Sequence, residues 1–188
     1  MFPLADGTYY VAHGGNSKLL NHHFRNLSQK YALDIVKLNA YGDSNSRRDT
    51  NADYSSLIYN EAVFCPCAGT VTSAIDGFPD LALGQRDPKN PAGNHVLISA
   101  EGTDIYIGFA HLKNGTVSVK AGEKVCAGQS IGRVGNSGNT TLPHLHIHAK
   151  RGGNPGNMLD GVGVPMRFAG QWLARNSVVR ARSVSASS

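Results

Sequence analysis

The sequence predicts a mainly β fold, a small antiparallel sheet arranged as a sandwich or a barrel. Short runs rich in Val, Ile and Thr recur along the chain, and Gly, Asn, Asp or Pro separates most of them, which is typical of all-β sandwiches and barrels. Glycine makes up 22 of the 188 residues, and helical periodicity is scarce. The predicted strands are EAVFCPC, GTVTSAI, NHVLISA, DIYIGFAHL, TVSV, SIGRVG and HLHIHAK.

The segment LSQKYALDIVKL allows two interpretations. A helix would place Leu27 and Asp34 on one face, whereas a strand over YALDIVKL would align Ala32, Asp34 and Val36. We favour the strand, because it gathers these three side chains on one face. A carboxylate in so apolar a strand is costly unless it is paired or bound to a metal, which makes Asp34 a candidate site residue.

Alternation within two later runs identifies their apolar faces. Ile105, Ile107 and Phe109 share one face of DIYIGFAHL, and Val96 and Ile98 share one face of NHVLISA.

Turn-rich stretches divide the chain. Residues 41–56 and 77–93 are expected to be long surface loops, which often carry function. A single domain is expected over 1–170, with its core at about 21–150 and a rim extension over 151–170. The end, 171–188, is expected to be a basic and partly disordered tail.

Composition excludes several classes of protein. The hydrophobic share of 40% excludes a disordered chain, and no apolar stretch approaches the ~20 residues of a membrane span. Three cysteines are too few for a disulfide scaffold. The net charge of +5 lies mostly from residue 151 onward, which favours solubility first and attraction to an anionic polymer second. The start, MFPLADGTYYVAHGG, lacks the pattern of a signal peptide.

The segment PHLHIHA carries three histidines in alternation. In a strand, His144, His146 and His148 project from one face, while Leu145 and Ile147 point into the core. Positions on one face lie roughly 6.6 Å apart, so two imidazoles can share one small site, and zinc binds imidazole nitrogen at ~2.0 Å. Solvated surface histidines are the alternative, although three directly after a glycine-rich turn are unusual for an inert surface.

Further ligands must come from elsewhere, because a catalytic zinc usually has three protein ligands and an open fourth position. Besides Asp34, His111 stands out, since it ends an apolar strand where a catalytic group fits well. A site on Cys65, Cys67 and Cys126 is disfavoured, because the CPC spacing is tighter than that of a zinc knuckle and would strain a mutual disulfide. The other candidates are His13, His22, His23 and His95.

Four segments resemble, in the expected order, the lysostaphin-like (LytM-type) zinc metallopeptidases, which are endopeptidases of bacterial cell walls. They are NHH with QKYALDI, CPCAGTV, FAHLKNGTVSVKAGEKVCAGQSIGRVGNSG and PHLHIH, which together cover about residues 21–150. The resemblance implies the family fold, a duplicated hybrid motif with long loops flanking a narrow groove that has zinc on its floor.

The resemblance also implies a role for each matching residue. His23, Asp34 and His146 would hold one zinc ion per chain. His111 and His144 would form the catalytic pair, one as general base and the other as oxyanion stabiliser, and the sequence does not distinguish which does which.

The first ligand motif departs from the usual HxxxD pattern. Eleven positions separate His23 from Asp34, as in a branch of the family that has an NxH segment and a later QRxAxD. His22 therefore stays an alternative to His23. His148 and His22 are otherwise expected to contact a zinc ligand or the substrate.

The implied function is a zinc-dependent endopeptidase that hydrolyses peptidoglycan stems or cross-links, such as a pentaglycine bridge or a D-alanyl–diaminopimelate link. A non-catalytic relative that binds the wall or activates other hydrolases is the alternative, although all five site positions carry competent side chains. The hairpin VSVKAGEKVCAGQSIGRVG also resembles a biotinyl or lipoyl carrier, which has no need of PHLHIH. The expected partners are peptidoglycan peptides, with no nucleic acid and no membrane span. The chain is expected to be a monomer outside the cytoplasm, periplasmic or secreted.

Overall fold

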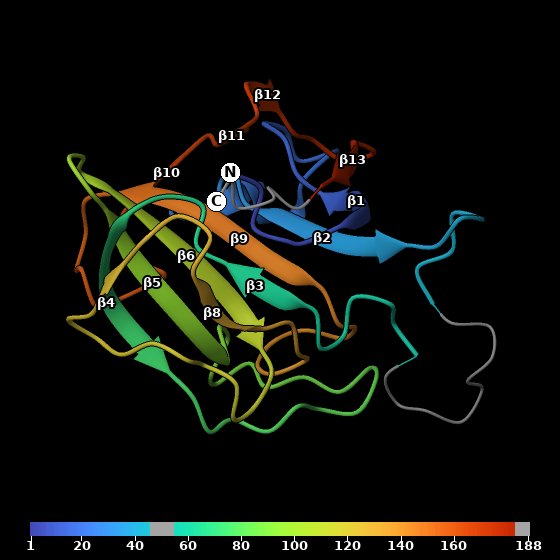
Figure 1. The fold of residues 1–188 in the computed structure, drawn as a ribbon, viewed down its shortest axis with the longest axis horizontal. Coiled ribbons are helices and arrows are strands. Elements are labelled where there is room, and N and C mark those ends of the chain that lie inside the picture. The colour runs from blue at the N-terminus through green and yellow to red at the C-terminus, as the bar shows by residue number, and fades with distance from the viewer. Residues whose placement is uncertain (46–54, 183–188) are drawn as a thin grey trace, which may run out of the picture.

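A computed structural model describes residues 1–45 and 55–182, which form a nearly all-β molecule (Figure 1). One short 3-10 turn, η1 (His22–Arg25), is the only helical element of these residues. The strands are β1 (Gly7–His13), β2 (Leu33–Leu38), β3 (Ala62–Phe64), β4 (Gly69–Ile75), β5 (Asn94–Ala100), β6 (Ile105–Leu112), β7 (Lys124–Val125), β8 (Ser130–Arg133), β9 (Leu145–Arg151), β10 (Val162–Val164), β11 (Arg167–Phe168), β12 (Gln171–Trp172) and β13 (Val178–Ala181).

One large antiparallel sheet dominates the molecule. Its order is β13-β1-β2-β9-β6-β5-β4-β7, with β10 added beside β9. Two small pairs, β3 with β8 and β11 with β12, complete the fold. Since β13 and β7 stand at opposite ends of the pairing order, the sheet formed by the described strands is open. The prediction of a mainly β, antiparallel fold is confirmed.

The core lies on the apolar face of the central strands. Leu145 and Ile147 of β9, Ile35 of β2 and Phe109 of β6 are all completely buried. The opposite face of the same strands carries the histidines and Asp34. The strand interpretation of YALDIVKL is confirmed from Leu33 onward, and the alternation of β9 explains how one strand serves both core and site.

The predicted loop 77–93 agrees with the structure, whereas the predicted tail contains strands. Residues 77–93 contain no strand, as expected, and residues 46–54 of the other predicted loop lie outside the described residues. The predicted tail contains β12 and β13, and β13 pairs with β1. Because VVRA is too short to read as a strand alone, only its partner strand explains it. The domain limits of 1–170 stay a prediction, and 183–188 lie outside the described residues.

The cysteines are unpaired. Cys65 is buried, Cys67 is partly buried, and Cys126 is exposed. In the described part of the chain, no helix is long and apolar enough to cross a membrane.

Candidate functional site

The register of the large sheet aligns the candidate residues on neighbouring strands. His13 of β1 lies opposite Asp34 of β2, and Asp34 lies opposite His146 of β9. On the other side, His146 lies opposite Ala110 of β6, the residue before His111. Residues directly opposite in an antiparallel pair have Cβ atoms about 4.5–5.5 Å apart. Strand pairing therefore brings side chains from distant parts of the sequence to one place.

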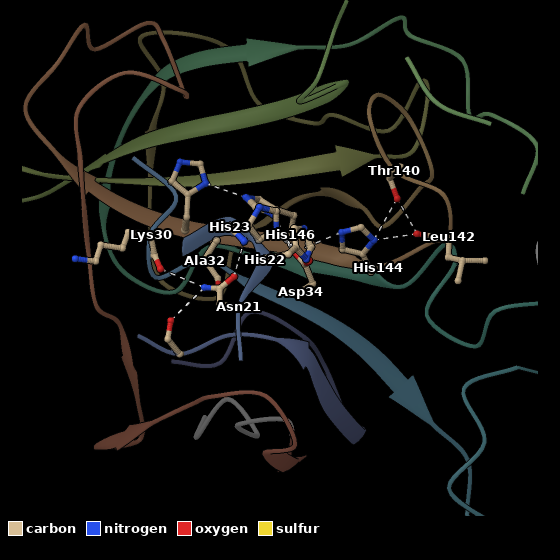
Figure 2. Close-up of polar contacts among 12 residues, drawn as sticks. Asn21, His22, His23, Lys30, Ala32, Asp34, Thr140, Leu142, His144 and His146 are labelled. Atoms are coloured by element: carbon tan, nitrogen blue, oxygen red, sulfur yellow. Dashed lines mark hydrogen bonds and ion pairs between the residues drawn. The ribbon is translucent and has the colours of Figure 1, made fainter. Parts of the chain in front are cut away.

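A turn before β2 supplies the histidines of NHH. The side-chain oxygen of Asn21 caps η1 by accepting the backbone N–H of His23 at 2.9 Å. The amide nitrogen of Asn21 faces the carbonyl oxygens of Gly15, Lys30 and Ala32 at 3.2, 3.2 and 3.1 Å. This buried side chain ties the histidine turn to the start of β2 (Figure 2). The sequence analysis did not single out Asn21, although its place before two histidines was a signal.

Lys30 occupies the position where an HxxxD motif has its histidine. Its ammonium nitrogen lies 5.0 Å from the ring centroid of Phe24 and 5.6 Å from that of Tyr31. Figure 2 shows the Lys30 side chain directed away from Asp34. The fold thus bridges the eleven-residue separation by bringing η1, and with it His23, over β2.

We expect Asn21→Ala to lower the free energy of unfolding by about 2–4 kcal/mol, because it removes a helix cap and leaves buried carbonyl oxygens without their donor. Urea unfolding of the metal-free protein measures the change. Asn26→Ala is the matched control, since Asn26 ends the same turn, is exposed and makes no side-chain hydrogen bond to the described residues. A loss at Asn21 no larger than that at Asn26 would contradict the role of the cap.

The carboxylate of Asp34 is the centre of the cluster (Figure 2). His23 Nε2 lies 3.1 and 3.0 Å from its two oxygens, and His146 Nδ1 lies 2.9 Å from Oδ1. His144 Nε2 is 3.5 Å from Oδ1, and His22 Nε2 is 3.7 Å from Oδ2. The His22 side chain is 55% exposed, against 12% for His23. His23 is therefore the closer and better enclosed partner of Asp34.

Charge and burial make this centre a strong site for a cation. Burial opposes the charge of Asp34, yet His144, His146 and His23 together hold the pKa of its carboxyl well below the usual value. Burial lowers the pKa of His146 to about 3, although its contact with Asp34 acts in the other direction. A buried, ionised carboxylate needs a positive partner, and a neutral imidazole beside it adds no charge that would repel a cation.

His111, the penultimate residue of β6, has a strained backbone. Its φ of 60° lies in the left-handed region, which residues other than glycine seldom adopt and which recurs at functional sites. Its N–H donates to the Ala92 carbonyl and its own carbonyl accepts from Gly135, both at 3.0 Å. His111 Nδ1 lies 2.9 Å from the Ser137 carbonyl, which can only accept. The proton therefore sits on Nδ1, and Nε2 makes no hydrogen bond to the described residues.

The turn before β9 orients His144 in the same way. His144 Nδ1 lies 2.9 Å from the Leu142 carbonyl and 3.3 Å from the Thr140 hydroxyl, so its proton sits on Nδ1 and Nε2 faces Asp34. The turn also carries Ser137. The backbone of Ser137 packs closely against Gly93, where a Cβ would lie 2.5 Å from the Ser137 carbonyl carbon. One glycine-rich turn thus supports both candidate catalytic histidines.

The pKa values of these two histidines shift in opposite directions. Burial, together with His144 and His146, lowers the pKa of His111 well below its usual value. Burial also acts to lower the pKa of His144, but the charge of Asp34 and their hydrogen bond raise it overall. The ring centroids of His111 and His144 are 5.0 Å apart. A neutral imidazole and a readily protonated one therefore stand side by side.

The remaining histidines lie around this centre or away from it. His148 is completely buried, and its Nδ1 lies 3.1 Å from His146 Nε2. His13 packs its ring edge against His22, with 4.2 Å between ring centroids. His95 lies outside the cluster, with Nδ1 2.8 Å from a neighbouring backbone carbonyl.

Two cavities meet at the histidine cluster. They have volumes of about 570 and 490 Å³, and both are lined by His22, His23, His111 and Asn139. Because they share these lining residues, we refer to the two cavities together as the groove.

Exposed arginines lie in both halves of the groove. Arg25 lines the first cavity and Arg86 the second, while Asp34 is the only acid among their described lining residues. The sequence analysis did not name Arg25, Arg86 or Asn139. Arg25 follows the NHH segment and Arg86 lies in the predicted loop 77–93, so their segments were identified but their side chains were not.

The site can hold a metal ion. Two groups of described side chains each bring three ligand atoms within 4.8 Å: His22, His23 and Asp34, and His111, His144 and His146. The contact of His146 with Asp34, at 2.9 Å, joins the two groups, and His23 approaches the same carboxylate within 3.0–3.1 Å. Ligands held at ~2.0–2.2 Å around a tetrahedral zinc lie roughly 3.3 Å apart, so the observed set needs to open only slightly.

Comparisons with known sequences identify the family of the chain. The model of peptidase family M23 matches residues 57–158, more than half of the chain. The peptidoglycan DD-endopeptidase ShyA of Vibrio cholerae is 36% identical over 176 residues, which cover 90% of this chain and 37% of that protein. The chain therefore spans well under half the length of this relative.

A solved structure shows a related fold. A proposed glycyl-glycine endopeptidase LytM from Ruminococcus gnavus is 17% identical, with a TM-score of 0.51, and the match covers 87% of this chain and 55% of that one. A zinc-containing peptidase from Vibrio cholerae is 24% identical over 58% of this chain and 27% of its own, with a TM-score of 0.38. The family match contains His111, His144 and His146. With this match the predicted resemblance is confirmed, and the chain belongs to peptidase family M23, the lysostaphin-like peptidases.

Proposed function

We propose that this chain is a zinc-dependent endopeptidase that hydrolyses peptide cross-links or stems of bacterial peptidoglycan. The observation that carries the proposal is the convergence of His23, Asp34 and His146 where two open cavities meet. Membership of family M23 and 36% identity to a peptidoglycan DD-endopeptidase support it.

The proposed zinc ligands are His23 Nε2, a carboxylate oxygen of Asp34 and His146 Nδ1. Two neutral imidazoles and one carboxylate leave the ion a net positive charge and an open position. When bound there, zinc supplies an acidified water and a polarised carbonyl group.

His111 and His144 are the proposed catalytic pair. Each donates Nδ1–H to a backbone carbonyl and offers Nε2 to the groove. An unprotonated Nε2 can take a proton from the nucleophile, and a protonated Nε2 can donate a hydrogen bond to the developing oxyanion. No glutamate or other acid but Asp34 lines the groove in the described residues, so these histidines are the groups available for proton transfer.

The charge of the groove favours an anionic peptide. Arg25 and Arg86 lie on either side of the cluster, and the only lining acid, Asp34, belongs to the proposed ligand set. A D-alanyl–diaminopimelate cross-link carries free carboxylates, which guanidinium groups bind well, whereas a pentaglycine bridge carries none. We therefore infer that the cross-link containing diaminopimelate is the substrate, and that the chain acts outside the cytoplasm, where peptidoglycan lies.

Digestion of purified sacculi tests the proposal. We expect the zinc-loaded protein to convert cross-linked muropeptide dimers of diaminopimelate-type sacculi into monomers, detected by chromatography and mass spectrometry. Asp34→Asn is the inactive control. Faster release from pentaglycine-bridged sacculi would contradict the substrate, and binding to both kinds of sacculi without any release would favour a non-catalytic wall-binding domain.

A further inference from the structure

The third histidine of HLHIH makes two hydrogen bonds in a fully buried position. His148 lies two residues after His146, on the same face of β9. Its Nδ1 is 3.1 Å from His146 Nε2, and its Nε2 is 3.0 Å from the carbonyl oxygen of Met158. Beyond them, His146 Nδ1 lies 2.9 Å from Asp34 Oδ1. A continuous chain of contacts thus runs from a backbone carbonyl to the centre of the site.

The carbonyl at the far end sets the direction of this chain. Because a carbonyl oxygen only accepts, His148 Nε2 must carry the proton that it donates to Met158. In a neutral His148 the other nitrogen, Nδ1, is then an acceptor, and His146 Nε2 must carry the next proton. His146 Nδ1 is consequently left with a lone pair that faces Asp34, which is the arrangement that a metal ligand requires.

The opposite arrangement places an extra charge in the core. If His146 carried its proton on Nδ1, its Nε2 would face His148 as an acceptor, and His148 would need protons on both nitrogens. That cation would lie completely buried beside Lys150, the next residue on the same face, which is itself buried. A second buried positive charge beside a lysine is strongly disfavoured.

We propose that His148 is a positioning residue, which is held by the Met158 carbonyl and keeps His146 in the one tautomer that leaves Nδ1 free for the metal. This inference rests on the proposed function, since it presumes that His146 binds zinc. It adds a residue that neither touches the metal nor lines the groove. Partners of this kind raise metal affinity by about 10–100-fold.

The surroundings of His148 are shaped to hold it. Gly108 of β6 lies directly opposite in the sheet, and a Cβ there would come within 3.1 Å of the His148 ring and 2.6 Å of the Met158 side chain. The loop that carries Met158 is fixed next to it, because the Ser28 hydroxyl donates to the Leu159 carbonyl at 2.9 Å. A Cβ at position 108 would therefore crowd the His148 ring and displace the end of the Met158 side chain.

Zinc affinity of matched variants tests the proposal. We expect His148→Leu, which has no acceptor for His146 Nε2–H, to weaken zinc binding by about 10–100-fold in competition with a chromophoric chelator. His148→Asn retains an acceptor oxygen near the position of Nδ1 and should recover most of the affinity. His95→Leu is the control with unchanged affinity, because His95 lies outside the cluster. Equal affinity of the Leu variant and the wild type would overturn the proposal.

The tautomers of the unmodified protein provide a test that needs no variant. Long-range proton–nitrogen NMR correlations of the zinc-loaded chain should show the proton on Nε2 in both His146 and His148. A proton on Nδ1 of either residue would overturn the proposal even if every variant failed to fold. A wild type that binds no zinc would instead contradict the proposed function itself, whereas zinc binding without hydrolysis would leave the role of His148 standing.

Discussion

Replacing His23 with alanine will release the bound zinc and stop hydrolysis, whereas the same change at His22 will leave both nearly intact. His23 Nε2 lies within 3.0–3.1 Å of both oxygens of Asp34, and its side chain is enclosed. His22 is 3.7 Å away and mostly exposed. Loss of a ligand should weaken zinc binding by more than about 100-fold, beyond the range typical of outer partners.

Metal content after dialysis and muropeptide release measure the two effects together. Both variants lose one imidazole from the same turn, so each is the structural control of the other. The assignment would be reversed if His22→Ala lost its zinc while His23→Ala retained it. Retention by both variants would instead move the site to the second group of ligand atoms, His111, His144 and His146.

The local pattern of the last histidine segment was enough to predict its geometry. A strand has a period of two, so HLHIH alone places His146 and His148 on one face and Leu145 and Ile147 on the other. The structure agrees, with Leu145 and Ile147 completely buried in the core. The fold class was predictable for the same reason, because most of its strands repeat this short-range signal.

The pairing of strands was not predictable from the residues alone. Asp34 meets His146 because β2 and β9 pair in one register. The two residues are 112 positions apart in the sequence, so no local pattern predicts their contact. Only the family resemblance linked the two. A shift by one residue would have turned Asp34 to the opposite face, so the site depends on long-range packing that periodicity does not report.

Small supporting groups were missed for a similar reason. Asn21 acts through three carbonyl oxygens, and backbone groups carry no signature in a sequence. His148 was predicted to contact a zinc ligand or the substrate, but its anchor, the Met158 carbonyl, was not predicted. Strand β13 was not predicted, because the four residues VVRA form a strand only through their pairing with β1. Arg25 and Arg86 could not be assigned to the site from the sequence, because only the folded chain places them in the lining of the groove.

Replacing His111 or His144 with alanine will leave zinc in place and lower kcat by about 10²–10⁴-fold, the usual contribution of a positioned proton-transfer group. Both side chains are held by an Nδ1–H bond to a backbone carbonyl and offer Nε2 to the groove. Neither makes the short contacts with Asp34 that His23 and His146 make, since even the nearer one, His144, is 3.5 Å away. Variants at these two positions should therefore lose activity but keep zinc, whereas the His23 variant should lose both.

Zinc content and kcat, measured on the same preparations, decide the matter. His95→Ala is the control, because this histidine has a carbonyl partner on Nδ1 as well but lies outside the cluster. Its kcat should stay within a few-fold of the wild type.

Loss of zinc from His144→Ala would make His144 a ligand, through the same Nε2 that faces Asp34. If instead one single variant and the double variant were equally slow, the two imidazoles would act in one step, since groups that act as a unit are not additive. Independent losses that multiply in the double variant would assign the proton acceptor and the oxyanion donor to two separate histidines.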